Sequence, residues 1–399
     1  MPRSAPARAP ITSPAAATVF TTVLTQGPVS RVDVARRTGL SSAAVTKAAR
    51  PFIEAGYLEE LASAERTAPG AGRPASPLAI RPDREYFIGV KITGDDLIGV
   101  VTDLQAQIRV AKHHALTSHD VDHVVRALTD LVAELLAGSA PDGATSFRDR
   151  AYCLGVAVSG DVDRDSGLVR YSPFLGWRDV PLAELLEDST GLATTLENDV
   201  KALTVAEQWF GEGVGAASFA LVTVGTGIGS ALVLDGRLVG GAHGVAGEIG
   251  HVPVAGMGAD GPACHCGGTG CVEAIASTEA IVASARRAAN DPALTLAEAV
   301  ARARAGDEPL RAVFANAGHA IGLGLGALVN LFGPERIVVS GEGVATYDLF
   351  EEQIRRTFAE QAFGSASRCG LVIRPLPFEE WARGAAAVAV QSLFVSDRL

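Results

Sequence analysis

Three cysteines within eight residues form the densest group of reactive side chains in the sequence. One residue separates Cys264 from Cys266, and Cys271 follows after four more residues, three of which are glycines. This spacing is too close for an ordinary disulfide framework, but it brings three thiolates to one point, as a structural zinc site requires. Cys153 and Cys369 lie elsewhere in the sequence and are expected to be unreactive thiols.

A tetrahedral zinc site needs a fourth ligand, and two histidines are candidates. His251 lies thirteen residues before Cys264, whereas His265 lies between Cys264 and Cys266 and would have to turn against both neighbours to share their metal. The pattern predicts one structural zinc ion per chain with no open coordination position. The alternative is a set of three free, buried cysteines.

A second group of polar residues follows predicted strands, at the ends where ligands of α/β proteins bind. Asn198 and Asp199 come directly after the predicted strand 193–197, and Gly160 lies in a turn after the predicted strand 152–158. Carboxylates and amides form the paired hydrogen bonds that hold sugar hydroxyls. Alternatively, Asn198 and Asp199 cap the following helix, and that role is compatible with ligand binding.

Residues 29–52 have the pattern of two short helices around a tight turn. Small apolar residues recur at helical spacing on both sides of Gly39, which suits a turn with positive φ, and Val45 would anchor the second helix. The outward face of this second helix carries hydroxyls and cations, at Ser42, Thr46, Lys47 and Arg50. Such side chains suit a major groove and its phosphates, so we predict a helix-turn-helix that binds double-stranded DNA.

Two short strands, 57–61 and 77–80, are predicted after these helices, with a polar loop between them. The loop presents Arg73 between a glycine and a proline, and an arginine held in this way suits a narrow minor groove. Strand, loop and strand would form the wing of a winged helix-turn-helix. The alternative is a packing or dimerisation module of three helices with a disordered loop.

The elements that must position the other candidate residues begin near residue 85, where buried strands are predicted. Residues 86–103 form one predicted hairpin around the turn 93–96, and residues 219–234 form another around the glycine loop 225–229. A helix is predicted over residues 120–137. Two similar hairpins predict a duplicated α/β unit, that is, two lobes with a ligand cleft between them.

Composition and charge limit the class of protein. The chain has 399 residues, of which 48% are hydrophobic and 20% charged, which is typical of a soluble globular protein of two or three domains. The best candidate for a membrane span, 320–332, is short and contains three glycines, so no membrane protein is expected. Residues 1–10 lack the apolar core of a secretion signal, and a cytoplasmic location is therefore expected.

The net charge of −11 is distributed unevenly. Residues 1–84 carry 11 Lys or Arg against 6 Asp or Glu, a net charge of +5, which leaves −16 for the rest of the chain. A basic first fifth on an acidic body indicates one module that binds a polyanion and another with a different role.

Taken together, the motifs resemble those of the ROK family, which comprises bacterial sugar kinases and winged-helix, sugar-responsive repressors. The resemblance covers about residues 18–395. It is carried by separate motifs at residues 197–200 (Glu-Asn-Asp-Val), 224–229, 247–251 (Gly-Glu-Ile-Gly-His), 264–273 and 333–340. It implies a winged helix-turn-helix followed by a two-lobed, actin- or hexokinase-like (ribonuclease H-like) sugar-binding domain.

The resemblance also assigns roles to individual residues. It implies that His251 is the fourth zinc ligand, beside Cys264, Cys266 and Cys271. It further implies a set of sugar ligands, namely Gly160, Asn198, Asp199, Glu248, His251 and Glu273. His251 would serve the metal and the sugar through opposite ring nitrogens.

The first hairpin separates the kinase interpretation from the regulator interpretation. In kinases of the family this turn supplies amides for the ATP phosphates and an aspartate for magnesium. The corresponding residues here are Lys91, Thr93, Asp95 and Asp96. A carboxylate 4 Å from a phosphate costs about 1 kcal/mol in water and about 4 kcal/mol near a protein surface, so poor ATP binding is expected. Asp199, the base in the kinases, is retained, but it also suits a sugar hydroxyl.

We therefore predict a sugar-responsive transcriptional regulator, a repressor of carbohydrate genes that is not an enzyme. An ATP-dependent sugar kinase with a DNA-binding domain is the first alternative, and a protein-binding scaffold is the second. The expected partners are an operator duplex, a monosaccharide or sugar derivative, and further copies of the chain in a dimer or dimer of dimers. The predicted organisation is a flexible tail over 1–17, a DNA-binding domain over 18–82, and a sugar-binding domain over 83–399, with lobes of about 83–200 (plus the C-terminal helix) and 201–380.

Overall fold

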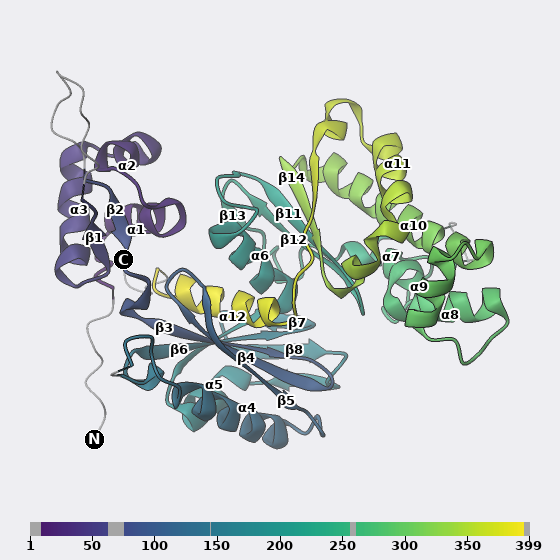
Figure 1. Cartoon of the computed structure of the whole chain (residues 1–399), viewed down its shortest axis with the longest axis horizontal. Coiled ribbons are helices and arrows are strands. Elements are labelled where there is room, and N and C mark those ends of the chain that lie inside the picture. The colour runs from purple at the N-terminus through teal and green to yellow at the C-terminus, as the bar shows by residue number, and fades with distance from the viewer. Residues whose placement is uncertain (1–8, 63–75, 144, 256–260, 395–399) are drawn as a thin grey trace. The chain divides into compact units, whose positions relative to one another are not determined.

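The computed structural model describes residues 9–62, 76–143, 145–255 and 261–394, and the chain divides into two units (Figure 1). The first unit joins the residues up to Gly215 with those from Glu379 onward, and the second unit is Ala216–Phe378. The last helix of the chain therefore belongs to the first unit.

The N-terminal part has the helix-turn-helix that the sequence predicts. Its elements are α1 (Pro14–Gln26), α2 (Arg31–Thr38), α3 (Ser42–Glu54), β1 (Leu58–Glu60) and β2 (Leu78–Ile80). Gly39 ends α2 with a φ of 72°, the left-handed conformation that glycine adopts without strain. Ser41 caps α3, and Val45 is fully buried. The predicted wing is present as the antiparallel pair β1 and β2, but Arg73 and its loop lie outside the described residues.

The predicted flexible tail, residues 1–17, overlaps α1. The helix begins at Pro14, because the Ser13 hydroxyl accepts a hydrogen bond from the Ala16 amide and proline is well suited to the first helical position. Ala16 is already buried.

A five-stranded sheet forms the centre of the first unit, in the order β10-β6-β3-β4-β5. Its strands are β3 (Tyr86–Ile92), β4 (Asp96–Asp103), β5 (Ile108–Ala115), β6 (Ala151–Val158) and β10 (Ala193–Asn198). A small sheet of β7 (Asp161–Asp163), β8 (Leu168–Ser172) and β9 (Trp177–Val180) follows β6. The helices are α4 (Val121–Leu136), α5 (Leu182–Thr190), α6 (Asp199–Phe210) and α12 (Glu379–Gln391), with short 3-10 turns η1 (Pro82–Arg84) and η2 (Phe147–Asp149).

Successive side chains of β3 point to opposite faces of the sheet. Ile88 and Val90 pack in the cluster that includes the apolar faces of α4 and α5. Phe87 packs in the cluster that includes α12 and the N-terminal helices. Lys91 has the same parity as Phe87 and is buried, so a charged residue lies on the α12 side of the sheet.

The second unit contains another five-stranded sheet, in the order β13-β12-β11-β14-β15. Its strands are β11 (Phe219–Val224), β12 (Ile228–Leu234), β13 (Arg237–Leu238), β14 (Arg336–Ser340) and β15 (Gly370–Ile373). The helices are α7 (Val272–Ala276), α8 (Thr278–Ala289), α9 (Leu296–Arg304), α10 (Glu308–Phe332) and α11 (Glu351–Gln361), with 3-10 turns η3 (Ile249–His251), η4 (Glu342–Leu349) and η5 (Gly364–Arg368).

Both sheets have the same topology. In each, a hairpin continues into a third antiparallel strand on one side and pairs with two parallel strands on the other. This repetition agrees with the duplicated α/β unit that the two hairpins predict.

In the described part of the chain, one helix, α10, is long and apolar enough to cross a membrane by length and composition. However, 61% of its most apolar 18-residue window is buried within the protein. Phe314, Ile321 and Leu325 of α10 lie in the hydrophobic cluster of the second unit, so the helix forms part of a protein core.

Candidate functional site

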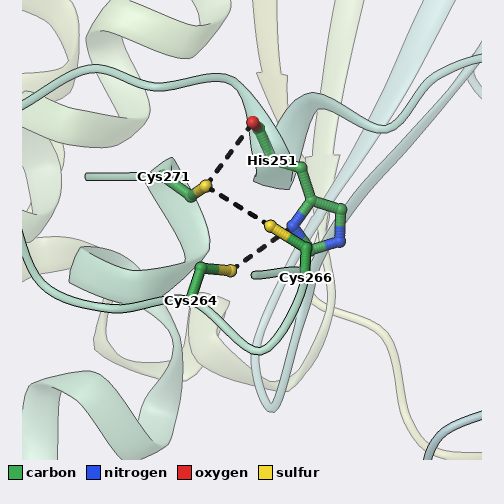
Figure 2. Close-up of side chains that lie close together, drawn as sticks. All are labelled: His251, Cys264, Cys266 and Cys271. Carbon is green, nitrogen blue, oxygen red and sulfur yellow. Dashed lines mark hydrogen bonds between the residues drawn. The ribbon is translucent and has the colours of Figure 1, made fainter. Parts of the chain in front are cut away.

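The three clustered cysteines lie close to His251 (Figure 2). The Nδ1 atom of His251 and the three sulfur atoms all lie within 4.8 Å of one another. His251 ends η3, and Cys271 immediately precedes α7. A turn closed by a hydrogen bond from the Cys264 amide to the Gly268 carbonyl (2.9 Å) brings the cysteines together.

The distances between these donor atoms fit a tetrahedral zinc ion. Bonds of about 2.3 Å to sulfur and about 2.0–2.1 Å to nitrogen separate two sulfurs by about 3.8 Å, and a sulfur from a nitrogen by about 3.5–3.6 Å. Cys266 Sγ lies 3.8 Å from Cys271 Sγ, and Cys264 Sγ lies 3.5 Å from His251 Nδ1. The four residues could therefore hold a metal ion of this size.

The thiols of the cluster differ in acidity. Burial raises the pKa of Cys271 to about 12 and also raises the pKa of Cys264. A hydrogen bond from the Gly268 amide lowers the pKa of Cys266. Since a coordinating thiol must be deprotonated, a bound cation would have to supply the stabilisation that burial removes.

His265, the competing zinc ligand, is directed elsewhere. Its Nδ1 atom lies 3.0 Å from a carboxylate oxygen of Glu273, and its side chain is 56% exposed. It belongs to a second group of close polar atoms, with His251 and Glu273, and not to the group that contains the sulfurs.

Three predicted sugar ligands lie in the first unit, at one edge of its sheet. The parallel register pairs Val158 of β6 with Ile92 of β3 and with Asn198 of β10, so the carboxyl ends of the three strands coincide. Asn198 Oδ1 caps α6 by accepting the Val200 and Lys201 amides at 3.0 and 3.2 Å. Its amide nitrogen donates to the carbonyl of Gly160 at 3.0 Å. The capping role and the proximity to Gly160 therefore coexist.

The same edge holds a buried ion pair that the sequence analysis missed. Lys91 Nζ lies 2.5 Å from Asp199 Oδ2 and 2.8 Å from Ser159 Oγ, and the Ser159 hydroxyl donates to Asp199 Oδ2 at 2.6 Å. Burial opposes ionisation of Asp199, but the Lys91 ammonium and these hydrogen bonds outweigh it and hold the pKa of Asp199 below its usual value. A lysine within an otherwise apolar strand was the available clue.

The remaining predicted sugar ligands lie in the second unit. Glu273 Oε2 accepts the Ile228 amide at 2.8 Å. The Glu248 carboxylate is 4.0 Å from His251 Nε2, the ring nitrogen opposite the one that faces Cys264. Glu248 and Glu273 therefore lie near the His251 ring, whose Nε2 atom is directed away from the cysteines.

Several backbone amides in both hairpin turns have acceptors within the protein. In the first unit, the Thr93 hydroxyl accepts the amides of Asp95 and Asp96 at 3.2 and 2.8 Å. In the second unit, a carboxylate oxygen of Glu342 accepts the Thr226 amide at 2.7 Å. No motif in the sequence points to Glu342.

The predicted DNA-binding residues that are described lie on one helix. Ser42, Thr46, Lys47 and Arg50 of α3 are exposed, whereas Val45 and Ala49 face the core. Arg50 pairs with Glu54 one turn later, at 2.7 Å between Nε and Oε1.

Comparison with known proteins supplies the family context. The profile of the ROK family matches residues 87–392. The chain is 28% identical over 334 residues to the DNA-binding transcriptional dual regulator NagC of Escherichia coli K12, covering 82% of this chain and 80% of the relative.

Two solved structures are also similar. A ROK family transcriptional regulator, a homologue of the E. coli MLC protein, superposes with a TM-score of 0.78 at 26% identity and covers 95% of this chain and 96% of its own. A ROK family glucokinase from Streptomyces griseus, in complex with glucose and AMPPNP, superposes with a TM-score of 0.66 at 28% identity and covers 77% of this chain and 99% of its own.

Proposed function

The chain belongs to the ROK family, and from this membership we propose that it is a sugar-responsive, DNA-binding transcriptional regulator. It acts as a repressor of genes for carbohydrate uptake or metabolism in the cytoplasm. It binds an operator duplex as a homodimer or dimer of dimers, and its DNA affinity changes when a monosaccharide or sugar derivative binds.

The observation that carries this proposal is the helix-turn-helix that precedes the family match. The helices α1 to α3 and the pair β1 and β2 lie before residue 87, where that match begins. The exposed face of α3 combines hydroxyls with the cations Lys47 and Arg50, which suit a major groove and its phosphates. The similar regulator covers 95% of this chain and therefore includes most of this part, whereas the similar glucokinase covers 77% of the chain.

We propose that the effector contacts the residues that the sequence predicts as sugar ligands. Gly160, Asn198 and Asp199 in the first unit, and Glu248, His251 and Glu273 in the second, offer the planar acceptors and amides that sugar hydroxyls require. A structural zinc ion, held by His251 Nδ1 and the three cysteines, would fix the imidazole so that Nε2 faces a sugar. Zinc here would supply rigidity, since all four of its positions would be filled by the protein.

The Lys91–Asp199 pair favours a regulator over a sugar kinase. A kinase needs a carboxylate that accepts the proton of the sugar hydroxyl, and a general base works best when its pKa is near the working pH. Asp199 has a lowered pKa, and its Oδ2 atom is occupied by Lys91 and Ser159. Its other oxygen accepts the Val200 amide. Asp199 is therefore suited to accept a hydrogen bond and poorly suited to remove a proton.

The hairpin turns give a second argument of the same kind. Backbone amides in these turns would have to bind the ATP phosphates. The amides of Asp95 and Asp96 donate to Thr93, and the Thr226 amide donates to the Glu342 carboxylate. A nucleotide would have to displace these internal acceptors, and its phosphates would face the negative charge of Glu342.

DNA and sugar binding test the proposed function directly. An operator can be selected from a random duplex pool, and its affinity measured by fluorescence anisotropy with and without xylose, glucose, N-acetylglucosamine or glucose 6-phosphate. We expect sequence-specific binding that one of these sugars changes at least several-fold. Failure to select any specific duplex would contradict the proposal.

An ATP-dependent sugar kinase that carries a DNA-binding domain is the second candidate, because Asp199 and the 225–229 loop are retained. Incubation with ATP, magnesium and the same sugars should give no more ADP than the Asp199→Asn variant does. Turnover of a few per second in the wild type, absent in that variant, would favour the kinase.

A further inference from the structure

Helix α6 joins the proposed effector site to an aromatic residue at its other end. This inference rests on the proposed function, because Asn198 and Asp199 at the start of α6 belong to that site. The helix has 12 residues and therefore spans about 18 Å. Trp209 lies in the last turn of α6. The Trp209 ring contacts the ring of Phe394, the last described residue, with centroids 5.3 Å apart.

Helix α12 packs tightly against both α6 and the sheet. A Cβ atom on Gly384 of α12 would lie 2.8 Å from the Leu203 amide nitrogen of α6. On its other side, α12 leaves no room for side chains on Gly89 of β3 or Gly155 of β6, where a Cβ would lie 2.0 and 1.9 Å from α12 carbonyl oxygens. Backbones packed this closely move together, so a shift of α6 is shared with α12 and Phe394.

From Trp209, ring contacts continue through Phe394 to α3. Phe394 stacks on Phe20 of α1 at 5.7 Å, and Phe20 stacks on Phe52 of α3 at 4.6 Å with only 8° between the ring planes. Phe20 and Phe52 are fully buried. We call Trp209, Phe394, Phe20 and Phe52 the aromatic column. It connects α6 to the helix that carries the proposed DNA-binding face.

The DNA-binding domain is attached to the sheet at a second point, beside η1. The Arg84 guanidinium lies over the Tyr57 ring at 4.8 Å and donates to the Ala55 carbonyl at 2.9 Å. The Tyr57 hydroxyl donates to buried Glu85 at 2.7 Å. One attachment lies at the chain connection and the other at the aromatic column, and the two touch where Phe20 meets the edge of the Tyr57 ring at 5.9 Å. A shift of the column would therefore act on α3 beside the chain connection and tilt the helix there.

We propose that α6, α12 and the aromatic column couple effector binding to the DNA affinity of α3. A ligand bonded to Asn198 and Asp199 shifts the start of α6, and the rigid α6–α12 pair carries the shift through Trp209 and Phe394 to Phe20 and Phe52. By linkage, the sugar must change DNA affinity by the same factor by which DNA changes sugar affinity.

The test compares Trp209→Leu and Phe394→Leu with the wild type and with a matched control, Phe363→Leu. Phe363 is 86% exposed in the second unit and is not part of the column. For each full-length protein, operator affinity is measured with and without the sugar that acts on the wild type. We expect the wild type and the control to change affinity by a factor of about 5–150, the usual range of allosteric coupling. Both column variants should bind DNA and sugar separately, with a coupling factor of about 1–2.

Column variants that respond as strongly as the wild type would overturn this inference and leave the proposed function intact. A wild type that responds to none of the sugars would overturn the proposed function and the inference with it. Hydrogen exchange on the wild type gives a check that does not depend on variants: the active sugar should change amide protection in α1 and α3. Unchanged protection there, at saturating sugar, would also overturn the inference.

Discussion

Lys91 is the cation that faces the Asp199 carboxylate in the candidate site. A buried ion pair gains Coulomb energy only by giving up hydration, so its value depends on complete hydrogen bonding. The Lys91 ammonium meets Asp199 and Ser159 and lies 5.6 Å from the centre of the Trp381 ring. These contacts keep the carboxylate charged and oriented within the protein.

Replacing Lys91 with methionine should therefore leave Asp199 buried without its cation. We expect Lys91→Met to lower the free energy of unfolding at pH 7 by about 3–5 kcal/mol, the cost of breaking a buried pair. Urea unfolding measures this value. The exposed pair Lys112–Glu134 provides the control, since Lys112→Met should cost about 1 kcal/mol or less.

The difference between Lys91→Met and the wild type should shrink in acid. The pKa of Asp199 is lowered in the folded wild type, so the pair contributes its stability above the unfolded pKa of about 3.9 and loses it as pH falls through the folded pKa. Without Lys91, burial would raise the pKa of this carboxyl, so the variant would bind a proton and regain stability as the pH falls. A difference in unfolding free energy that stays constant from pH 7 to pH 3 would contradict this account of the pair.

At the metal cluster, Cys266→Ala should reduce bound zinc from one equivalent per chain to well below one, measured by elemental analysis of purified protein. The sugar response should disappear as well, because His251 would lose the metal that orients its ring. Cys369→Ala is the control, since Cys369 lies outside the four-residue cluster. A full equivalent of zinc in Cys266→Ala would refute the ligand assignment.

At the scale of elements, α3 buries one face in the core and thereby leaves its proposed DNA-binding face exposed. Val45, Ala49 and Phe52 are buried at helical spacing, which turns Thr46, Lys47 and Arg50 outward. Arg50 is also paired with Glu54 on the same helix. DNA bound to the proposed face would therefore compete with Glu54 for this guanidinium.

We expect Arg50→Ala to weaken operator binding by about 1–3 kcal/mol if Arg50 contacts a base, measured by fluorescence anisotropy. Lys47→Ala should weaken binding to all DNA sequences. It should also reduce the slope of log affinity against log salt concentration by about one, as expected for one lost phosphate contact. Glu54→Gln should strengthen binding, because it frees Arg50 and removes a negative charge. Arg355 forms a similar pair with Glu351 on α11, so Arg355→Ala is the matched control and should have no effect.

At the scale of the whole molecule, effector sensing and DNA binding should be separable by mutation. Asp199→Asn should still bind the operator with near wild-type affinity but should no longer respond to sugar. The amide oxygen can still accept hydrogen bonds from Lys91 and Ser159, but the Lys91 ammonium loses its counter-ion, so we expect a folded protein of lower stability, checked by circular dichroism. A folded Asp199→Asn protein that fails to bind the operator would argue against separate modules.

Repressors of this type bind two half-sites about one helical turn apart, so the chain should occupy a pseudo-palindromic operator as a dimer. Sedimentation of the complex with the selected duplex measures the number of chains bound. One chain per duplex would contradict the proposed assembly.

The sequence determined the features that depend on short-range geometry. The helix-turn-helix follows from helical spacing around Gly39, and the cysteine cluster follows from three cysteines within eight residues. The hairpins follow from apolar strands around polar or glycine turns. In each case neighbouring residues meet because the backbone between them is short, so spacing alone predicts the contact.

Only the tertiary structure decided which distant side chains meet. Lys91 and Asp199 are 108 residues apart and meet because β6 aligns the ends of β3 and β10. Glu342 reaches Thr226 across 116 residues. Such contacts depend on strand register and on how helices pack against the sheet, and a shift of one residue would turn Lys91 to the opposite face. The sequence shows a lysine at position 91, where kinases of the family have an aspartate. Only the folded chain shows that Asp199 is the partner of this lysine.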